Sequence, residues 1–298
     1  MQTEISIQNS SETGIKHRSL GADTLRRFLR NKMAVLGAVI IIFLLLIAVC
    51  APLLTKYNPR KTDIWESMQK PSSKHIMGTD ETGRDIYART LYGARISLSV
   101  GICGIIVALI IGLTLGAISG YYGGWIDTLI MRFTDIVLAF PAALLAIAVA
   151  AVFERRSIYT IFLILGLIGW AGIARVVRAK VISVKETEFS EAARALGAGN
   201  LRIILKHILP NSFAPIMVSA TIGIAGNILT EAWLSFLGLG LDASVPSWGT
   251  MIRDALGQVE SYWLYVFPGI AIMIAVLGFN LLGDGLRDVL DPRLKGTS

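Results

Sequence analysis

The sequence predicts an all-α membrane protein with six transmembrane helices. Of its 298 residues, 54% are hydrophobic and only 16% carry a charge, whereas soluble domains carry about 25% charged residues. Six runs of at least 18 residues contain no Asp, Glu, Lys or Arg, and a helix needs about 20 apolar residues to cross the hydrocarbon layer. The runs lack the alternation of polar and apolar residues that barrel strands show. Because lipid offers no partner to backbone polar groups, each run is expected to be helical.

Charged residues on either side delimit the six expected spans. The spans are 33–55, 96–126, 136–153, 157–174, 207–230, with apolar character continuing to 241, and 261–283. The chain then divides into an N-terminal segment 1–32, a first transmembrane helix 33–55, an external loop 56–95, a transmembrane core 96–283 and a C-terminal tail 284–298.

Six spans place both chain ends on the same side of the membrane. If that side is the cytoplasm, the inside segments hold 17 Lys and Arg residues and the outside segments hold 11. This bias favours cytoplasmic termini, because short cytoplasmic segments are enriched in basic residues. The loop 56–95 works against it, since it carries eight of the outside basic residues.

Small residues and prolines shape the expected helices. Gly112, Gly116 and Gly120 follow a four-residue spacing in the second span, which lets neighbouring helices approach closely. The alternative is a helix that lines a pathway and shifts. Pro141 and Pro215 lie in the third and fifth spans, where each is expected to kink its helix.

The stretch between the fourth and fifth spans is amphipathic rather than apolar throughout. Two sets of apolar residues recur there at i, i+3, i+4 and i+7, which predicts two short helices. The sets are Phe189, Ala192, Ala193 and Leu196, then Leu201, Ile204, Leu205 and Ile208. Ser190 and Asn200 are the expected N-caps. Gly197 and Gly199 are expected to form the turn, and Pro210 to stop the second helix.

This stretch closely resembles the EAA loop of ABC importer permeases. The resemblance rests on Glu191-Ala192-Ala193, on Gly197 after three intervening residues, and on His207-Ile208-Leu209-Pro210 after nine more. The usual form has isoleucine where this chain has His207. In that family the loop, here 186–210, is the coupling helix that docks into a groove on the ATP-binding subunit. The residues that the resemblance assigns to this contact are Ser190, Glu191, Ala192, Ala193, Arg194, Leu196, Gly197, Ala198, Leu201, His207 and Pro210.

Other motifs are similar to those of dipeptide, oligopeptide and nickel permeases. They are residues 78–85, 91–98, 231–240, 248–252 and 283–293. The resemblance implies the type I ABC importer permease fold and the C-type membrane subunit of a prokaryotic cytoplasmic membrane. The partners it implies are a second, homologous permease subunit, two ATP-binding subunits that hold ATP and Mg, and an extracytoplasmic substrate-binding protein. The solute stays open among dipeptides, oligopeptides, nickel chelates and related molecules.

Several polar residues are candidates for roles in transport. Asn227 and Asn280 lie in expected spans, where they either line a hydrated path or bond neighbouring helices. Glu231, near the outer end of the fifth span, is expected either to line the path or to pair at an interface. By resemblance, the outer loop is expected to face the binding protein, and Trp248, Arg253 and Asp254 are the residues expected to contact it.

The chain lacks the sequence signatures of catalysis. It has no G-x-x-x-x-G-K-[ST] phosphate loop, no histidine-glutamate metal motif and no nucleophile elbow. Cys50 and Cys103 lie within apolar runs and are expected to pack there. We therefore expect a protein that is not an enzyme and binds no cofactor, driven by partner subunits. The alternatives are a secondary transporter or channel, whose inverted repeats are not apparent, and an intramembrane enzyme, whose catalytic residues are missing.

Overall fold

The computed structural model describes residues 20–153 and 157–290, which form helices and loops without a strand. Five of the helices are long and apolar enough to cross a membrane, and a bent pair adds a sixth candidate span. The predicted all-helical membrane fold is confirmed. In chain order the elements are α1 Leu20–Arg30, α2 Lys32–Leu54, η1 Ile64–Glu66, α3 Ile86–Tyr122, α4 Gly124–Ala139, α5 Ala142–Val152, α6 Ile158–Lys185, α7 Glu188–Ala195, α8 Asn200–Ile203, η2 Ile204–Ile208, α9 Leu209–Asn211, α10 Phe213–Phe236, α11 Trp248–Asp254 and α12 Trp263–Leu290.

Three of the spanning helices, α3, α6 and α12, are longer than the charge-free runs, and α3 and α12 extend into the expected loop and tail. α3 begins at Ile86, inside the expected external loop 56–95, because the Asp85 side chain caps it by accepting a hydrogen bond from the Ala88 amide at 2.7 Å. α12 continues to Leu290, inside the expected tail 284–298. Charges end an apolar run but do not end a helix, so both helices project beyond the hydrocarbon.

The third expected span, 136–153, is wrong as a single helix. α4 and α5 meet at a break with a bend of 96°. Pro141 has no amide hydrogen and disfavours the helical region for the residue before it, and Phe140 accordingly has an extended backbone with φ −84° and ψ 138°. The disturbance expected at Pro141 is thus present as a full break. The kink expected at Pro215 is absent, because this residue lies in the first turn of α10, where a missing amide hydrogen is tolerated.

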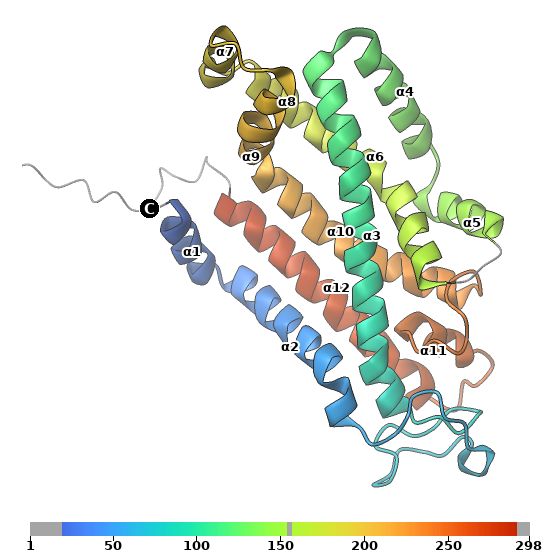
Figure 1. Ribbon diagram of the computed structural model, residues 1–298. Coiled ribbons are helices and arrows are strands. Elements are labelled where there is room, and N and C mark those ends of the chain that lie inside the picture. The colour runs from blue at the N-terminus through green and yellow to red at the C-terminus, as the bar shows by residue number, and fades with distance from the viewer. Residues whose placement is uncertain (1–19, 154–156, 291–298) are drawn as a thin grey trace, which may run out of the picture.

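The close packing predicted from the glycine spacing is found between α3 and α6. A Cβ atom on Gly116 would lie 2.5 Å from the carbonyl oxygen of Ala174, and one on Gly112 would lie 2.8 Å from Cβ of Ile173. Only glycine allows the two backbones to approach this closely. Around this pair, α10 packs against α3 and α12, and α2 packs against α12 and α3 (Figure 1).

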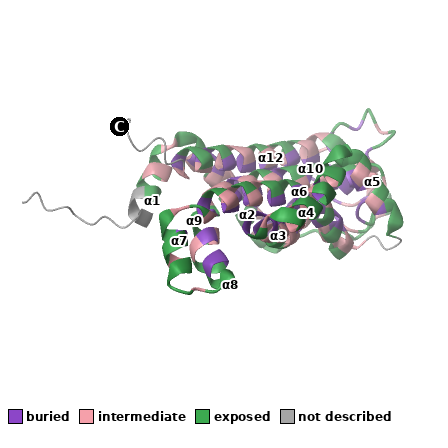
Figure 2. Ribbon diagram, turned by 90° about the horizontal axis from the view of Figure 1, so that it is seen from above, coloured by how far each residue is buried: buried purple, intermediate pink, exposed green. Residues whose placement is uncertain are grey.

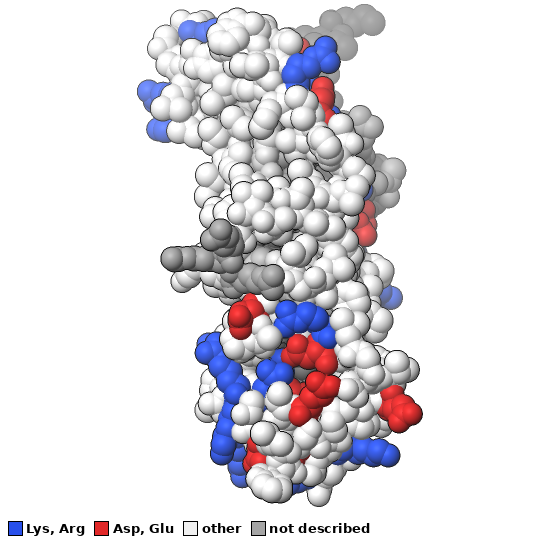
Figure 3. Space-filling model, turned by 90° about the vertical axis from the view of Figure 1, so that its right-hand side faces the viewer, with Lys and Arg blue, Asp and Glu red and all other residues white. Residues whose placement is uncertain are grey.

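The bundle has two different ends. One end holds α7, α8 and α9, together with α1 and the last turn of α12; we call it the α7 end (Figure 1). The opposite end holds residues 55–85 and α11, and we call it the loop end. Figure 2 shows that α7 and α8 project beside the bundle with mostly exposed residues. Figure 3 shows charged side chains gathered at the loop end, below a broad region of uncharged ones.

Candidate functional site

The base of α7 is bonded to the end of α6. Thr187 is the N-cap residue of α7, so the prediction of Ser190 as N-cap is wrong. Ser190 lies inside the helix and is fully buried. Its hydroxyl donates to the carbonyl oxygen of Val184 at 2.8 Å, and the Thr187 hydroxyl donates to the same oxygen at 2.6 Å. Two hydrogen bonds to one carbonyl at the end of α6 therefore fix where α7 begins.

The turn after α7 depends on Gly197, as the sequence predicts. This residue has φ +79°, in the left-handed region that favours glycine. The Gly197 amide donates to the carbonyl of Arg194 at 3.0 Å, and the Ala198 amide donates to that of Ala193 at 3.1 Å. This pair of bonds is the Schellman motif, which ends a helix and turns the chain sharply. Leu196 is left at the tip of the turn.

The second helix of the loop is attached to α3. Gly199 is the N-cap residue, so the prediction of Asn200 as N-cap is wrong; Asn200 is the first residue of α8. The Asn200 side-chain oxygen accepts a hydrogen bond from the hydroxyl of Tyr121 at 2.8 Å, near the end of α3. The Lys185 ammonium lies 5.8 Å from the centre of the same tyrosine ring. The loop is thereby held by α3 as well as α6.

Pro210 does not stop the second helix, contrary to the prediction. The chain passes from α8 through the π-helical turn η2 and α9, and α10 begins after Ser212. The wider turn gives the Ile204 carbonyl a donor from the amide of Leu209, and it accommodates a proline that has no amide hydrogen to offer. Ser212 is buried, and its hydroxyl donates to the carbonyl of Ile208 at 2.8 Å. The loop therefore runs into a spanning helix without a flexible linker.

The two predicted apolar stripes divide between the protein interior and the outside. Ile203, Ile204 and Ile208 are buried in a cluster with residues of α3 and α6. Leu196 is 88% exposed and Leu201 is 69% exposed. We use the name outward face for the four large apolar side chains of the two stripes that are exposed. They are Phe189, Leu196, Leu201 and Leu205.

The residues assigned to the coupling contact differ in exposure. Seven are exposed, three are half-buried and Ser190 is buried. The exposed ones are Glu191, Ala192, Arg194, Leu196, Gly197, Leu201 and Pro210, and the half-buried ones are Ala193, Ala198 and His207. Large apolar patches on a surface that faces water commonly mark contacts with another protein.

Glu231 is a structural centre rather than part of an open path. Its side chain is fully buried in α10. One carboxylate oxygen accepts hydrogen bonds from the hydroxyls of Ser235 and Ser247, both at 2.8 Å, and the other accepts one from Ser97 at 3.4 Å. Ser247 is the N-cap of α11. The carboxylate thus joins α3, α10 and α11, and a solute does not reach it in this conformation, which corrects the expectation that it lines the path.

The two asparagines predicted for the path lie on neighbouring helices. The Asn227 side-chain nitrogen donates to the carbonyl of Gly101 at 3.2 Å, which bonds α10 to α3. This contact corresponds to the interhelical alternative that the sequence left open. Asn280 lies half-buried on α12.

Trp248 is not available for contact with another protein. It is 1% exposed, and its indole nitrogen donates to the carbonyl of Thr90 at 3.0 Å. The prediction that its side chain contacts the binding protein is therefore wrong. Trp248 instead packs α11 onto α3, where a Cβ on Gly93 would lie 2.9 Å from the indole ring.

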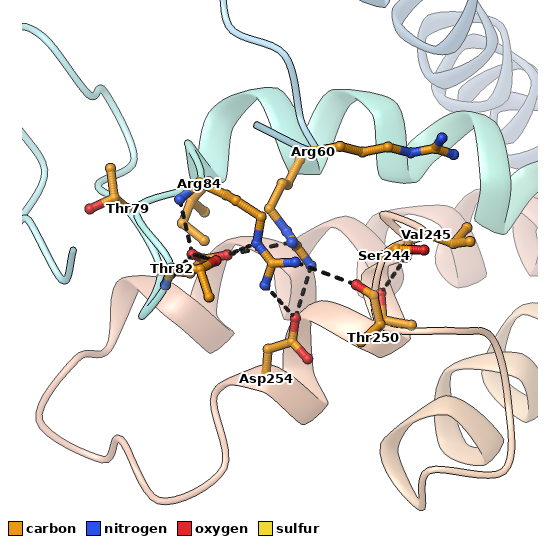
Figure 4. Close-up of polar contacts among 12 residues, drawn as sticks. Arg60, Thr79, Thr82, Arg84, Ser244, Val245, Thr250 and Asp254 are labelled. Atoms are coloured by element: carbon orange, nitrogen blue, oxygen red, sulfur yellow. Dashed lines mark hydrogen bonds and ion pairs between the residues drawn. The ribbon is translucent and has the colours of Figure 1, made fainter. Parts of the chain in front are cut away.

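Asp254 belongs to an ion-pair cluster at the loop end (Figure 4). Its carboxylate lies 3.1 Å from the guanidinium of Arg84 and 2.9 Å from that of Arg89. Asp80 pairs with Arg84 at 2.6 Å, and Arg253 lies 3.3 Å from Asp254. These pairs connect the 55–85 segment to α11. Arg253 and Asp254 are each about one-fifth exposed, so both reach the surface at this end.

Sequence reasoning missed a buried histidine at the same end. His75 lies between two carboxylates, with Nδ1 2.8 Å from Asp85 and Nε2 2.9 Å from Glu66. The run of acids and bases within 56–95 was the only signal, and it does not say which groups meet. In the part of the chain that the structure describes, no three His, Cys, Asp or Glu side chains are arranged to hold a metal ion.

Comparisons with known proteins cover nearly the whole chain. Residues 112–296 match the family described as binding-protein-dependent transport system inner membrane component, and residues 19–71 match the N-terminal TM domain of oligopeptide transport permease C. The chain is 49% identical over 274 residues to the dipeptide transport system permease protein DppC of Alkalihalophilus pseudofirmus, which covers 92% of this chain and 90% of the relative. It is 41% identical over 281 residues to the oligopeptide transport system permease protein OppC of Bacillus subtilis, with coverage of 94% and 92%. It is 42% identical over 272 residues to the glutathione transport system permease protein GsiD of Pectobacterium atrosepticum, with coverage of 91% and 90%.

Proposed function

Since the chain belongs to the family of binding-protein-dependent transport system inner membrane components, we propose that it forms half of a translocation path for dipeptides, oligopeptides or related small solutes. The family is a membrane permease component of ABC transporters, so the chain is a multi-pass membrane protein and not itself an enzyme. The relatives named for dipeptide, oligopeptide and glutathione transport support the solute class. A second, homologous permease subunit forms the other half of the path.

The outward face is the observation that carries the coupling role of loop 186–210. Its leucines are exposed at the tip of a turn that is itself held rigidly by α3 and α6. An apolar tip on a fixed support fits a groove on a separate subunit. Glu191 and Arg194 beside it are exposed and offer charges to that groove. Two ATP-binding subunits, which hold ATP and Mg, are the partners in this proposal.

The connection from the loop to the bundle supports a mechanism for transmitting motion. When ATP closes the two ATP-binding subunits, their grooves carry the outward faces of the two permeases toward each other. α8, η2 and α9 pass this displacement to α10, because Ser212 joins them without a linker. α7 passes it to α6 through Ser190. Rigid-body tilting of these helices then opens the path on the opposite side of the membrane.

The orientation follows from the same arrangement. The α7 end faces the cytoplasm of a prokaryotic cell, and both chain termini lie on that side. The bias of basic residues supports this, and the pocket that Asn211 of α9 lines together with Leu290 of α12 supports that the coupling loop and the end of the last helix share one side. The loop end then faces the substrate-binding protein, with Arg253 and Asp254 at its surface.

Removal of one leucine tests the coupling role. Leu196→Asp places a charge in the groove of the partner. The amount of ATP-binding subunit that co-purifies with the permease should therefore fall at least about tenfold. Leu256→Asp is the matched control, because Leu256 is 57% exposed at the loop end, and it should retain them. Equal retention by both variants would contradict the proposal, and transport without any ATP-binding subunit would favour a secondary transporter.

Two further variants separate binding from coupling. Gly197→Pro removes the left-handed turn, since proline requires a negative φ, and Glu191→Arg reverses a charge at the tip. Both should insert into the membrane normally and abolish solute-stimulated ATP hydrolysis by the assembled complex. Wild-type stimulation in either variant would refute the role assigned to that residue.

A further inference from the structure

A pocket of about 690 Å³ lies at the loop end, where α2 ends and α3 begins. Three basic residues line it, Lys56, Arg60 and Arg95, together with the tyrosines Tyr57 and Tyr92. No acidic residue is among its lining residues. This site is separate from the coupling loop and from the ion-pair cluster around Asp254.

The three cations of this pocket have no acidic partner among the described residues. In contrast, Arg84 and Arg89 nearby are each paired with two carboxylates. The guanidinium of Arg95 lies 5.9 Å from the centre of the Tyr92 ring. Figure 4 shows that the Arg60 side chain extends away from the ion-pair cluster. Three unpaired cations around one hollow create a positive potential that favours an anionic group.

The wall of the pocket is held in place by local hydrogen bonds. The Asn58 side chain accepts a hydrogen bond from the amide of Arg60 at 2.9 Å. The Tyr57 hydroxyl donates to the carbonyl of Lys74 at 3.1 Å, and its ring lies 4.9 Å from that of His75. These contacts fix the backbone that carries Lys56 and Arg60 before any ligand arrives, which lowers the entropic cost of binding.

The pocket lies at the boundary between the hydrocarbon and the water. The apolar run of α2 ends at Leu54, and on this last stretch Val49 is 72% exposed and Leu53 is 87% exposed. Exposed apolar side chains on a spanning helix are open to contact with lipid, and the pocket begins directly after them. Tyrosine and basic side chains at this depth are typical of contact with headgroups. The surface that surrounds the pocket is thus continuous with the lipid-exposed surface of α2.

We propose that this pocket binds the phosphate of an anionic phospholipid from the leaflet at the loop end. Arg60 and Arg95 donate hydrogen bonds to the phosphate oxygens, Lys56 adds a third positive charge, and the acyl chains lie along Val49 and Leu53. Guanidinium groups suit this role because their planar donors match the geometry of phosphate. The bound lipid would fill a hollow between α2 and α3 and stabilise the end of the first spanning helix.

Native mass spectrometry of the full chain in its complex tests this proposal. The complex is purified from membranes that contain phosphatidylglycerol, and detergent is added until loosely held lipid is removed. The wild type should retain one phosphatidylglycerol per copy of this chain. Arg60→Gln/Arg95→Gln should lower that occupancy at least about tenfold, because two charge-assisted hydrogen bonds are lost. Arg60→Lys/Arg95→Lys keeps both charges and should recover part of it.

A charge-matched control and a second ligand make the test decisive. Lys61→Gln/Lys70→Gln removes two positive charges from the same loop outside the pocket and should leave occupancy unchanged. Equal occupancy in the Arg60→Gln/Arg95→Gln variant and the wild type, or equal loss in the control, would overturn the proposal. A carboxylate is the other anion that fits, so a tripeptide and its C-terminal amide are compared in phosphatidylcholine nanodiscs. A preference for the free acid that disappears in the Arg60→Gln/Arg95→Gln variant would assign the pocket to the solute instead and overturn the lipid proposal.

Discussion

The two ends of the bundle differ in which side chains they bury and which they expose. At the loop end, charged and polar side chains are buried against one another, as Arg89, His75 and Glu231 are. Among the described residues, every buried side-chain nitrogen and oxygen atom has a hydrogen-bond partner. At the α7 end, Leu196 and Leu201 are largely exposed at the tip of the molecule. The loop end also exposes apolar side chains, such as Trp65 at 94%, but its buried charges find their partners within the chain, whereas the exposed leucines of the α7 end lie on helices that project beside the bundle.

The difference shows how to distinguish a structural charge from a functional surface. Burying a polar group without a partner costs several kcal/mol, so the partners at the loop end are explained by stability alone. Leaving large leucines in water has no such explanation, because the chain could fold them inward. The projecting α7 end is therefore where we expect the ATP-binding subunit, and the predictions below test each half of this contrast.

The largest effect on stability is expected at Glu231. Glu231→Leu removes the acceptor of three buried serine hydroxyls, at a cost of about 3 kcal/mol in the free energy of unfolding. The thermal midpoint of the detergent-solubilised protein measures it. Glu231→Gln keeps one acceptor oxygen and should cost less. A variant with leucine that is as stable as the wild type would mean that the loop end does not depend on this carboxylate.

Overpacking between α3 and α6 is expected to rank next. Gly116→Leu places a side chain where a Cβ alone would lie 2.5 Å from the Ala174 carbonyl, and we expect a loss of about 2 kcal/mol. Gly172→Leu on α6 is the matched control, because no atom lies within 4 Å of a Cβ built there. The same thermal measurement applies, and similar midpoints for the two variants would contradict the close approach of these helices.

A smaller effect is expected where α7 meets α6. Ser190→Ala removes one buried hydrogen bond to the Val184 carbonyl, worth about 1 kcal/mol. The loss should appear as faster hydrogen exchange of α7 amides, with ATP-binding subunits still bound and solute-stimulated ATP hydrolysis reduced. Ser183→Ala, at an exposed position on α6, should leave both measurements unchanged. Normal ATP hydrolysis in Ser190→Ala would show that this anchor does not transmit motion.

The smallest effect concerns pH at the loop end. The hydrogen bond from Lys74 lowers the pKa of the Glu66 carboxyl below its ordinary value of 4.5. A carboxyl with a lower pKa in the folded state stabilises that state when ionised. Its contribution is complete above pH 4.5 and is lost as the pH falls through the lower folded value.

The variant Glu66→Gln isolates this contribution. It should be slightly less stable than the wild type at neutral pH, and the difference should disappear in acid. Thermal midpoints of both proteins across the acidic range measure it. A difference that persists unchanged at the lowest pH would assign the effect to packing rather than to the Lys74 pair.

Most of the fold could be predicted because it follows from the need to keep charges out of the hydrocarbon. The gaps between charged residues located five spans, but they did not reveal that α3 starts at Ile86, since a cap such as Asp85 acts outside the membrane. They also did not reveal the sharp break at Pro141. A proline in a span indicates that the helix is disturbed. The surrounding packing decides whether the helix bends or breaks.

The candidate site was predicted in outline and missed in detail. Periodicity and Gly197 predicted the two helices and their turn. They did not show that Ser190 points inward, or that a π-helical turn before Pro210 lets the helix continue through it. Both features depend on contacts with α6 and α10. Trp248 illustrates the same limit, since an aromatic residue near a span end packs either outward against headgroups or inward against a glycine such as Gly93.

Site-specific photo-crosslinking tests the contrast between the two ends most directly. A photoreactive amino acid is placed at position 196 or at position 256 of the full chain in cells, and the crosslinked products are identified by mass spectrometry. We predict an ATP-binding subunit, recognised by peptides that contain its phosphate loop, from position 196 and not from position 256. Crosslinks from position 196 to lipid alone, or to a protein on the outer side of the membrane, would contradict the proposed coupling role.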